Sequence, residues 1–332
     1  MNTLYSPQER PACIGVLVNP LGGRNRRRQQ ALIALERRCR GAGIRVWHWV
    51  QTAEEIELAL AECARVQTDI LVIHGGDGTV QASLTVLYGP DSPFPEVPPL
   101  LLLKGGTTNL IAGDVGIAGS QEQALVRLCH WAEGDGAPLS AVRRPLLRLL
   151  VPGHGPKYGM FFGAGCVIAA TRFYHQHLHG RTMQGLPGIC MTAAHSLWTL
   201  LGRRRSLVGS TPMALHLSGE RGEQGQFIIF LASTLQRFVF GLKPFWGQEE
   251  GRLRLTAVKS GARKLFWLLP WLAWGRLTRH GIRTNGYLSC NTDEVQLHLA
   301  DSVVLDGEMY APSSAVQPVV LQYGGEATFL QI

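Results

Sequence analysis

The chain has 332 residues, which is enough for about two domains. Apolar residues make up 45% of it and charged residues 17%, so it can bury a core and is not an intrinsically disordered chain. Its 32 lysines and arginines exceed its 24 acidic residues, and the formal net charge of +8 favours an anionic partner such as a nucleotide, a nucleic acid or an acidic membrane surface.

The cysteines and the apolar runs indicate the cellular compartment. The chain has 7 cysteines and no C-x-x-C pair, which argues against a disulfide framework or a zinc finger and favours a reducing environment. The longest apolar-rich stretches, Leu186–Leu201 and Leu265–Trp274, are shorter than the roughly 20 residues of a spanning helix. We therefore expect a cytoplasmic protein.

The first part of the chain alternates buried strands with helices. Strands are expected at Ile14–Val18, Ile44–Val50, Ile70–Ile73 and Leu100–Leu103, and helices at 26–40, at 52–63 and from Thr79 onward. Each strand but the second runs into a glycine-rich or Asn-Pro turn. This alternation predicts a three-layer α/β domain with a mostly parallel sheet, which binds ligands at the carboxyl ends of its strands.

The pattern changes between Gly134 and Pro145 to strands at irregular spacing. Helices are expected near 169–178, 189–201 and 262–277. We interpret residues 141–311 as an antiparallel β domain with inserted helices, and residues 1–140 as an α/β domain that is completed by about 312–332.

The segment Gly75-Gly76-Asp77-Gly78-Thr79 carries the sharpest chemical signal. Glycines after a buried strand let phosphate oxygens approach backbone N–H groups, and the following helix directs its N-terminus at the same anion. Asp77 is either a metal contact, a base for an incoming hydroxyl, or a helix cap in a plain strand–helix turn.

Three other segments are weak when taken alone. Asn19-Pro20-Leu21-Gly22-Gly23-Arg24 and Gly105-Gly106-Thr107-Thr108-Asn109 each follow an expected strand, and each could be a simple turn. Asp306-Gly307-Glu308 by itself is best explained as a type I′ hairpin turn.

In combination and in this order, the four segments resemble the diacylglycerol kinase catalytic domain family. The family includes sphingosine kinases, ceramide kinases and bacterial lipid kinases. The resemblance implies an N-terminal α/β domain, a C-terminal β-sandwich with inserted helices, and a nucleotide cleft between them. It also implies ATP, Mg²⁺ and a lipid hydroxyl as the phosphoryl acceptor.

The resemblance assigns roles to individual residues. It places Asp77, Asp306 and Glu308 in catalysis, with Asp77 as our first choice for the base and Asp306 as our second, and Asp306 and Glu308 at the metal. The residues that it places at the nucleotide are Asn19, Thr52, Gly75, Gly76, Gly78, Thr79, Gly106, Thr107 and Asn109.

The chain also departs from the family pattern. Gly22 stands where a small hydroxyl residue is usual, Ala82 stands where a Glu is usual, and no Asp occurs between 136 and 292 to meet a lipid headgroup. A nucleotide-binding relative without catalysis therefore stays an alternative, and an NAD kinase-like enzyme is a third hypothesis, supported by the GGDGT segment alone.

Basic and aromatic residues occur together near the end of the second domain. Lys264 precedes Trp267, Trp271 and Trp274, a combination that suits a membrane interface if the helix is not simply packed in the core. We expect a lipid substrate and peripheral contact with an anionic membrane, consider a homodimer, and expect no nucleic-acid partner because no such motif occurs.

Overall fold

The structure is a computed structural model that describes residues 3–5, 12–40, 44–117, 119–134, 138–177, 210–217, 222–238, 241–277 and 283–331. It divides into two compact units. Unit 1 is Met1–Arg144 with Gly325–Ile332, and unit 2 is Pro145–Gly324. Binding of nucleotide by the first domain and of lipid by the second stays a prediction.

Unit 1 is built around a parallel sheet, as the sequence predicts. Its strands are β2 (Ile14–Val18), β3 (Ile44–Trp49), β4 (Ile70–Gly75) and β5 (Leu100–Lys104), in the spatial order β3-β2-β4-β5. The end of β16 (Val319–Gln331) adds beside β5 through a parallel pairing of Phe329 with Leu100. Strands β2 and β4 are buried along their whole length, which explains why they read as continuous apolar runs.

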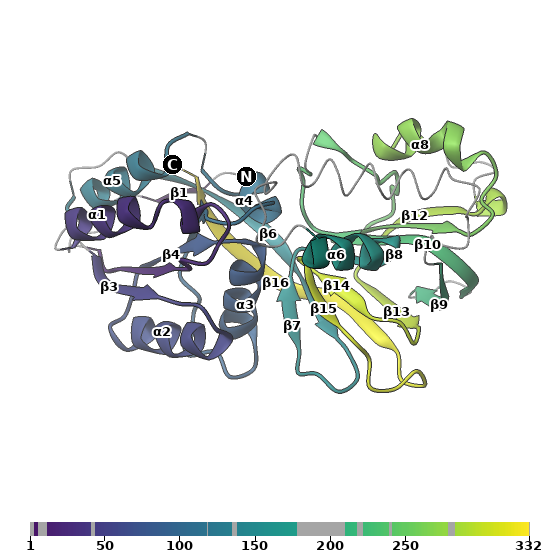
Figure 1. Cartoon of the computed structure of the whole chain (residues 1–332), viewed down its shortest axis with the longest axis horizontal. Helices are drawn as coiled ribbons and strands as arrows, with labels where there is room; N and C mark the ends of the chain where they lie inside the picture. The colour runs from purple at the N-terminus through teal and green to yellow at the C-terminus, as the bar shows by residue number, and fades with distance from the viewer. Residues whose placement is uncertain are drawn as a thin grey trace. The chain divides into compact units, whose positions relative to one another are not determined.

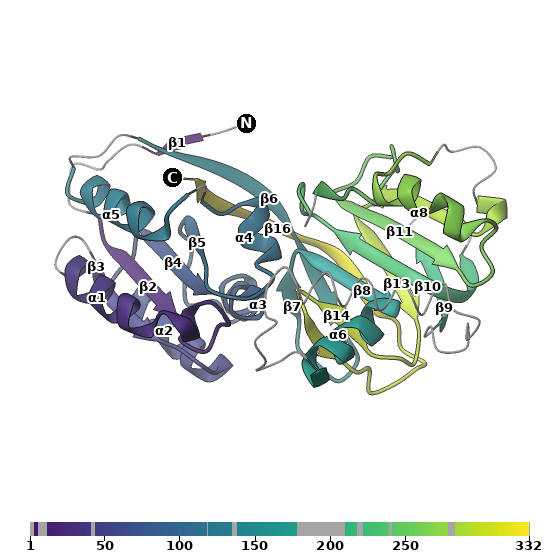
Figure 2. The same cartoon turned by 45° about the horizontal axis from the view of Figure 1, so that its top comes forward.

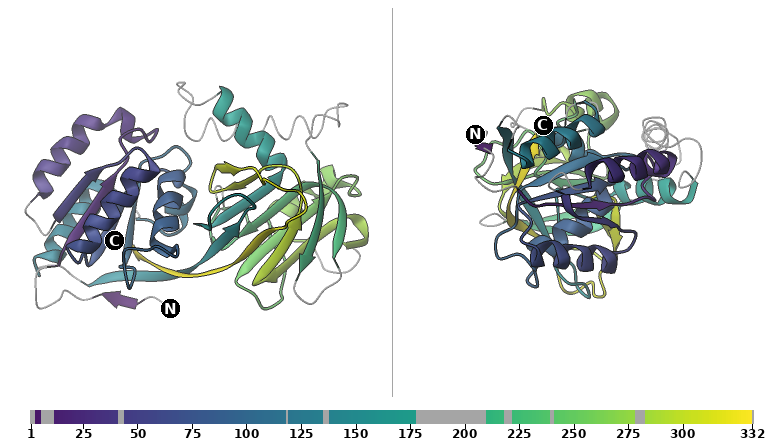
Figure 3. Two further views of the ribbon diagram at one scale, coloured as in Figure 1. Left: turned by 90° about the horizontal axis from the view of Figure 1, so that it is seen from below. Right: turned by 90° about the vertical axis from the view of Figure 1, so that its left-hand side faces the viewer.

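Helices cover both faces of this sheet (Figures 1 and 3). On one face lie α1 (Gln29–Cys39) and α5 (Gln121–Ala132), whose apolar residues share a core with β2, β4 and β5. On the other lie α2 (Ala53–Arg65) and α3 (Asp77–Tyr88), which pack against each other. The helix expected at 26–40 is split, because a 3₁₀ turn (η1, Asn25–Arg27) precedes α1.

The strand register brings the ends of the sheet strands into line. Val18 lies beside both Trp49 and His74, and Gly75 lies beside Lys104. The connections that follow β2, β3, β4 and β5 therefore all leave from one edge of the sheet, where a ligand site is expected in a parallel α/β fold.

Unit 2 consists mainly of antiparallel strands, which enclose their own apolar core. The strand order is β15-β14-β8-β10-β9-β13-β16, and β11 and β12 continue from β10. The strands are β7 (Lys157–Gly159), β8 (Phe161–Gly165), β9 (Thr211–Leu217), β10 (Glu223–Ser233), β11 (Leu253–Lys259), β12 (Tyr287–Thr292), β13 (Glu294–His298), β14 (Val303–Leu305) and β15 (Glu308–Tyr310).

Two helices of unit 2 are described. Helix α6 (Cys166–His177) follows β8, and α8 (Leu265–Ala273) lies across one face of β10, β11 and β12 (Figure 2). A 3₁₀ turn, η4 (Arg283–Asn285), precedes β12. The helix expected at 189–201 lies outside the described residues.

Two long strands pass from one unit to the other. Strand β6 (Leu139–Leu150) starts in unit 1, where the short β1 (Thr3–Tyr5) pairs with it, and β16 returns the chain to unit 1. The sequence pattern predicts a strand only from Leu146, because Pro145 interrupts the apolar run; instead β6 continues through Pro145. In the described part of the chain, no helix has the length and apolarity needed to cross a membrane.

Candidate functional site

The candidate site in unit 1 is formed by three loops at the carboxyl edge of the sheet. The first loop follows β2 (19–24), the second joins the end of β4 to the start of α3 (75–79), and the third follows β5 (105–109). Backbone bonds tie them together: Gly105 N–H donates to the Gly75 carbonyl at 2.9 Å, and Arg24 N–H donates to the Gly105 carbonyl at 3.0 Å. The three segments singled out in the sequence therefore form one structure.

Glycine is required where these loops approach one another. A Cβ on Gly106 would collide with the Cα of Gly76 in the second loop. A Cβ on Gly22 would lie 2.6 Å from the Gly105 carbonyl oxygen. The departure at Gly22 thus has a structural reason, because the third loop occupies the space that a hydroxyl side chain would fill.

Two asparagines connect the first loop to the second. The Asn19 side-chain amide donates to Thr79 Oγ1 at 2.9 Å. The Asn25 amide, which is 2% exposed, donates to the carbonyls of Asn19 at 2.8 Å and His74 at 3.2 Å. Burial of such a group is tolerated because its donors are satisfied, and the bonds fix the shape of the loops.

Asp77 is the first residue of α3, but its carboxylate caps a different helix. Its Oδ2 accepts the Leu110 N–H and its Oδ1 accepts the Ile111 N–H, both at 3.0 Å. These N–H groups begin α4 (Leu110–Asp114), whose N-cap Asn109 makes no side-chain cap bond. Asp77 therefore supplies the cap that α4 lacks and joins the second loop to the third.

The N-terminus of α3 itself has no side-chain cap. The first N–H groups of a helix have no partner within it, so those of residues 77–79 are available to an anion, which the helix dipole also favours. The Asp77 carboxylate accepts N–H groups at the start of α4, so it does not occupy the N–H groups of residues 77–79. The second loop can therefore hold a phosphate despite its acidic residue.

Burial raises the pKa of the Asp77 carboxyl above its ordinary value, because desolvation disfavours the charged form. The backbone N–H groups of Leu110, Ile111 and Asn109 act in the opposite direction without cancelling that effect. A carboxylate has about four lone-pair sites, so these N–H groups still leave capacity for another proton donor. Asp77 can thus serve both as a cap and as a proton acceptor.

The other predicted nucleotide residues of unit 1 have different local roles. The Asn109 amide is bonded twice to the Gly106 peptide, accepting from its N–H and donating to its carbonyl, both at 2.8 Å. Thr107 is half-buried in the same loop. Thr52 is the N-cap of α2, where its hydroxyl accepts the Glu55 N–H at 3.2 Å in a capping box. Contact of these residues with a nucleotide stays a prediction.

In unit 2, Asp306 and Gly307 form the turn between β14 and β15. Their φ angles of 50° and 94° are those of a type I′ turn, and Leu305 pairs with Glu308 across it. Asp306 is 4% exposed, and its Oδ2 and Oδ1 accept the N–H groups of Met160 and Phe161, each at 2.9 Å. Like Asp77, Asp306 thus holds two consecutive backbone N–H groups.

Glu308 differs from both aspartates. It is exposed, and among the described residues its carboxylate has no hydrogen-bond or ion-pair partner. The described residues include no group of three or more His, Cys, Asp or Glu side chains that could hold a metal ion. Mg²⁺ does not require one, because it binds through one or two carboxylates together with phosphate oxygens and water. Glu308 offers an open carboxylate of this kind, whereas both Asp306 oxygens already accept backbone N–H groups, so metal binding by this pair stays a prediction.

Comparisons with known proteins bear on this geometry. Residues 14–135 match the family model of the diacylglycerol kinase catalytic domain. The resemblance inferred from the motifs is confirmed. The matched segment contains all three loops and Thr52, whereas Asp306 and Glu308 lie outside it. A search of curated protein sequences gave no match.

Solved structures from Bacillus anthracis str. Sterne share the fold over nearly the whole chain. Two are provisionally assigned diacylglycerol kinases: one is 16% identical with a TM-score of 0.63, covering 97% of this chain and 98% of that one, and the other is 15% identical with a TM-score of 0.64, covering 98% of each. A third, described as a diacylglycerol kinase, is 13% identical with a TM-score of 0.57 and covers 97% of each chain. The mixed α/β fold class is thereby confirmed, and its details are those described for each unit.

Sequence reasoning missed two residues of the diacylglycerol kinase-like segment. Asn25 lies between arginines and has no pattern that marks it as buried. His74 is the next-to-last residue of β4 and is 4% exposed, but in the sequence it directly follows the expected strand Ile70–Ile73 and has no mark of a site residue. Burial lowers its pKa to about 4, the Arg24 charge acts in the same direction, and a hydrogen bond with Gln121 opposes both, so the ring is neutral at pH 7.

Proposed function

We propose that the protein is an ATP- and Mg²⁺-dependent kinase that transfers the γ-phosphoryl group to the hydroxyl of a lipid such as a diacylglycerol or a sphingoid base. The observation that carries the proposal is the joined set of three loops at the open N-terminus of α3. The match of residues 14–135 to the diacylglycerol kinase catalytic domain supports the reaction class. Phosphoryl transfer needs positioning and charge stabilisation rather than a covalent intermediate, and these loops are built for positioning.

We assign binding of the ATP phosphates to the N–H groups of residues 77–79. The bonds among Asn19, Asn25 and Thr79 fix the positions of the loops that carry these N–H groups, which supports this assignment. Arg24 and Lys104 lie in or next to the same loops, Arg24 exposed and Lys104 half-buried, and add positive charge at this edge. Magnesium bound to Asp306 and Glu308 would neutralise phosphate charge.

Asp77 remains our first choice for the general base and Asp306 our second. The raised pKa of Asp77 supports this order, because a base works best when its pKa approaches the working pH. Each of the two carboxylates also holds a pair of backbone N–H groups, so replacing either changes structure as well as chemistry.

The test is transfer of labelled phosphate from ATP to diacylglycerol, sphingoid base, ceramide and phosphatidylglycerol in mixed micelles with Mg²⁺. We expect one acceptor class to be phosphorylated. Asp77→Asn should then lower kcat by about 10²-fold or more, the contribution of a general base. Full activity of Asp77→Asn would remove this carboxylate from the mechanism.

Glu308→Gln has a matched control in the same unit. Glu250 is also an exposed carboxylate next to a glycine, so Glu250→Gln makes the same chemical change away from the proposed metal ligands. We expect Glu308→Gln to raise the Mg²⁺ concentration needed for half-maximal activity and Glu250→Gln to leave it unchanged. Equal responses of the two variants would contradict the metal assignment.

A second candidate function is nucleotide binding without transfer. It is favoured by one observation, that both candidate bases are engaged with backbone N–H groups. In the same assay this alternative predicts ATP binding with no phosphorylation of any acceptor in the panel.

A further inference from the structure

Helix α8 in unit 2 has two faces of different chemistry. On one face Leu272 is buried, and Leu265, Leu268 and Leu269 pack with it against Val258 of β11 and Tyr287 of β12. This face attaches α8 to the sheet, and Figure 2 shows the helix lying against those strands. Packing within the unit therefore explains the apolar residues on only one face of α8.

The other face presents tryptophans to solvent. Trp267 is 71% exposed and Trp271 is 53% exposed, and Trp274, just past the helix end, is 54% exposed. Their spacing of four and three residues puts all three on one side of the helix. Tryptophan is on average highly buried in folded proteins, so three exposed rings in one patch mark a surface that meets something apolar.

Cations surround this tryptophan face. Arg263 and Lys264 immediately precede α8, and Arg276 follows it. Lys243 adjoins its C-terminal end, where the Lys243 N–H donates to the Ala273 carbonyl at 2.8 Å. The side chains of these four residues are exposed, and none has an ion-pair partner in the part of the chain that the structure describes.

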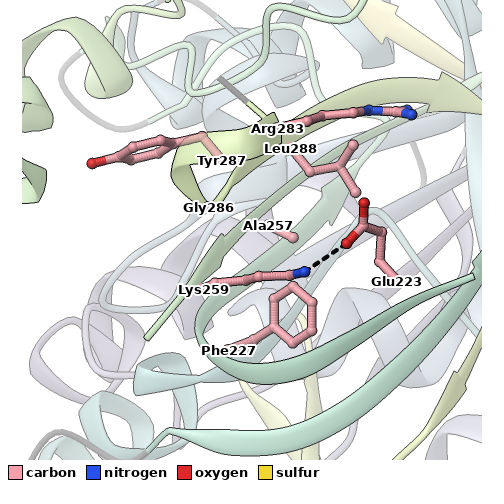
Figure 4. A pocket seen from close by; sticks show the side chains of 8 residues that line it. All are labelled: Glu223, Phe227, Ala257, Lys259, Arg283, Gly286, Tyr287 and Leu288. Atoms are coloured by element: carbon pink, nitrogen blue, oxygen red, sulfur yellow. Dashed lines mark hydrogen bonds and ion pairs between the residues drawn. The ribbon is translucent and has the colours of Figure 1, made fainter. Parts of the chain in front are cut away.

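The neighbouring Lys259, in contrast to these four cations, has an ion-pair partner within the unit. It lines a small cavity between β10, β11 and β12, where its Nζ lies 2.6 Å from Glu223 Oε2 and over the Phe227 ring (Figure 4). Its charge is neutralised within the unit. By contrast, Arg263, Lys264 and Arg276 lie in a stretch without acidic residues, because no Asp or Glu occurs between Glu250 and Asp293.

We propose that the tryptophan face of α8, with Arg263, Lys264, Lys243 and Arg276 at its rim, docks unit 2 onto an anionic membrane surface. Tryptophan rings suit the boundary between headgroups and acyl chains, and lysine and arginine beside them attract anionic headgroups. The helix lies in the plane of the interface and does not cross it, in keeping with its 9 residues.

The positive charge around the tryptophan face favours an anionic membrane over a second copy of the chain as the occupant of this face. In a two-fold symmetric dimer the same patch meets itself, so the four cations of one α8 would face those of the other. Like charges brought together in this way cost free energy, whereas an anionic lipid surface is attracted to all of them. An anionic membrane is therefore the occupant that matches both the apolar and the charged part of the surface.

The test is partitioning of the full-length protein, without ATP or acceptor lipid, onto sedimentable vesicles. Equimolar phosphatidylglycerol and phosphatidylcholine vesicles are compared with pure phosphatidylcholine at low salt. We expect binding to the anionic vesicles only, and weaker binding as salt rises. Brominated acyl chains should quench tryptophan fluorescence on binding, because the three rings enter the acyl boundary.

Two sets of variants locate the contact. Replacing Trp267, Trp271 and Trp274 by Ala should weaken partitioning by about tenfold or more, because each ring loses apolar contact with the lipid. Lys264→Gln should weaken it by about fivefold, the effect of one charge near an anionic surface. Arg252→Gln is the control, because Arg252 is also exposed but lies 3.3 Å from Asp293.

The outcomes are distinct. Absence of wild-type binding to anionic vesicles at low salt, or equal binding by all variants, overturns the proposal. A concentration-dependent dimer that the tryptophan variant abolishes, without vesicle binding, would show that a second copy covers the face. Because this assay contains no ATP, its result is independent of the proposed kinase reaction, which mixed micelles test separately.

Discussion

At the scale of single residues, the site in unit 1 depends on polar groups that serve backbone geometry. Asp77 belongs to α3 and caps α4, and Asn25 holds two carbonyls while almost fully buried. Both arrangements place a side chain where its loss would leave backbone groups unsatisfied. We expect residues of this kind to influence a bound phosphate through the shape of the loops.

His74 makes the stability of the folded chain depend on pH. Its pKa is about 4 in the folded chain and near 6.5 when unfolded, so below pH 6.5 the unfolded chain binds the proton more readily. Stability contributed by the neutral ring is therefore present above pH 6.5 and is lost as pH falls towards 4. Between pH 7.5 and pH 5 the loss is about 2 kcal/mol.

His74→Gln removes this titration and keeps a polar side chain. Urea unfolding of both proteins at pH 7.5 and pH 5 measures the effect as a difference of differences, so a general cost of the substitution cancels. We expect the variant to lose about 2 kcal/mol less than the wild type on acidification. The same pH dependence in both proteins would show that His74 does not titrate in this way.

The residue-scale roles were only partly predictable from the sequence. The glycine loops could be found because glycine after a buried strand is a local pattern. The bonds of Asp77 to Leu110 and Ile111 join residues more than thirty positions apart, and no local pattern encodes them. Asn25 and His74 were missed for the same reason, since their burial is a property of the assembled loops.

At the scale of elements, the third loop and α4 offer a matched pair of glycines. A Cβ at Gly106 collides with the backbone of Gly76, whereas one at Gly113, exposed within α4, meets nothing within 4 Å. Gly106→Ala should destabilise the protein by about 1–3 kcal/mol, because backbone must move, and should weaken ATP binding. Gly113→Ala should stabilise it by about 0.5–1 kcal/mol, because alanine favours a helix.

Urea unfolding and equilibrium dialysis with ATP measure these two effects. If Gly106→Ala bound ATP as well as Gly113→Ala does, the close contact of the second and third loops would be irrelevant to the nucleotide. This comparison separates loop geometry from a general effect of adding a methyl group.

The elements themselves were predictable to different degrees. The parallel strands of unit 1 are continuous apolar runs, and β2 begins and ends at the residues that the pattern predicts. The sequence predicts β6 too short, because Pro145 breaks the apolar pattern. In the structure, β1 pairs with β6 before Pro145 and β7 pairs with it after Pro145. Pairing partners distant in sequence thus extended a strand that local preference would end.

At the scale of the whole molecule, the proposed reaction requires residues of both units. The carboxylates of Asp306 and Glu308 belong to unit 2 and the phosphate-binding loops to unit 1. That the two act on one triphosphate stays a prediction. It rests on the resemblance to the diacylglycerol kinase catalytic domain family, because no local pattern can establish a contact over more than two hundred residues.

Hydrogen exchange with a non-hydrolysable ATP analogue and Mg²⁺ tests this prediction. Binding suppresses local opening, so amides of every segment that holds the nucleotide should exchange more slowly. We expect protection at residues 76–79 and 106–109 of unit 1 and, in the same sample, at 306–309 of unit 2. The exposed outer part of α2 serves as a control segment that should not change.

Protection confined to unit 1 would mean that nucleotide binds there without the acidic turn, and the metal assignment to Asp306 and Glu308 would fail. Glu308→Gln sharpens the experiment. If Glu308 holds the metal, this variant should lose protection at 306–309 while residues 76–79 stay protected, because the N–H groups of α3 bind phosphate without it. Loss of protection at both segments would instead indicate that the turn at 306–308 is needed for any nucleotide binding. Both units would then contribute to the affinity for the nucleotide.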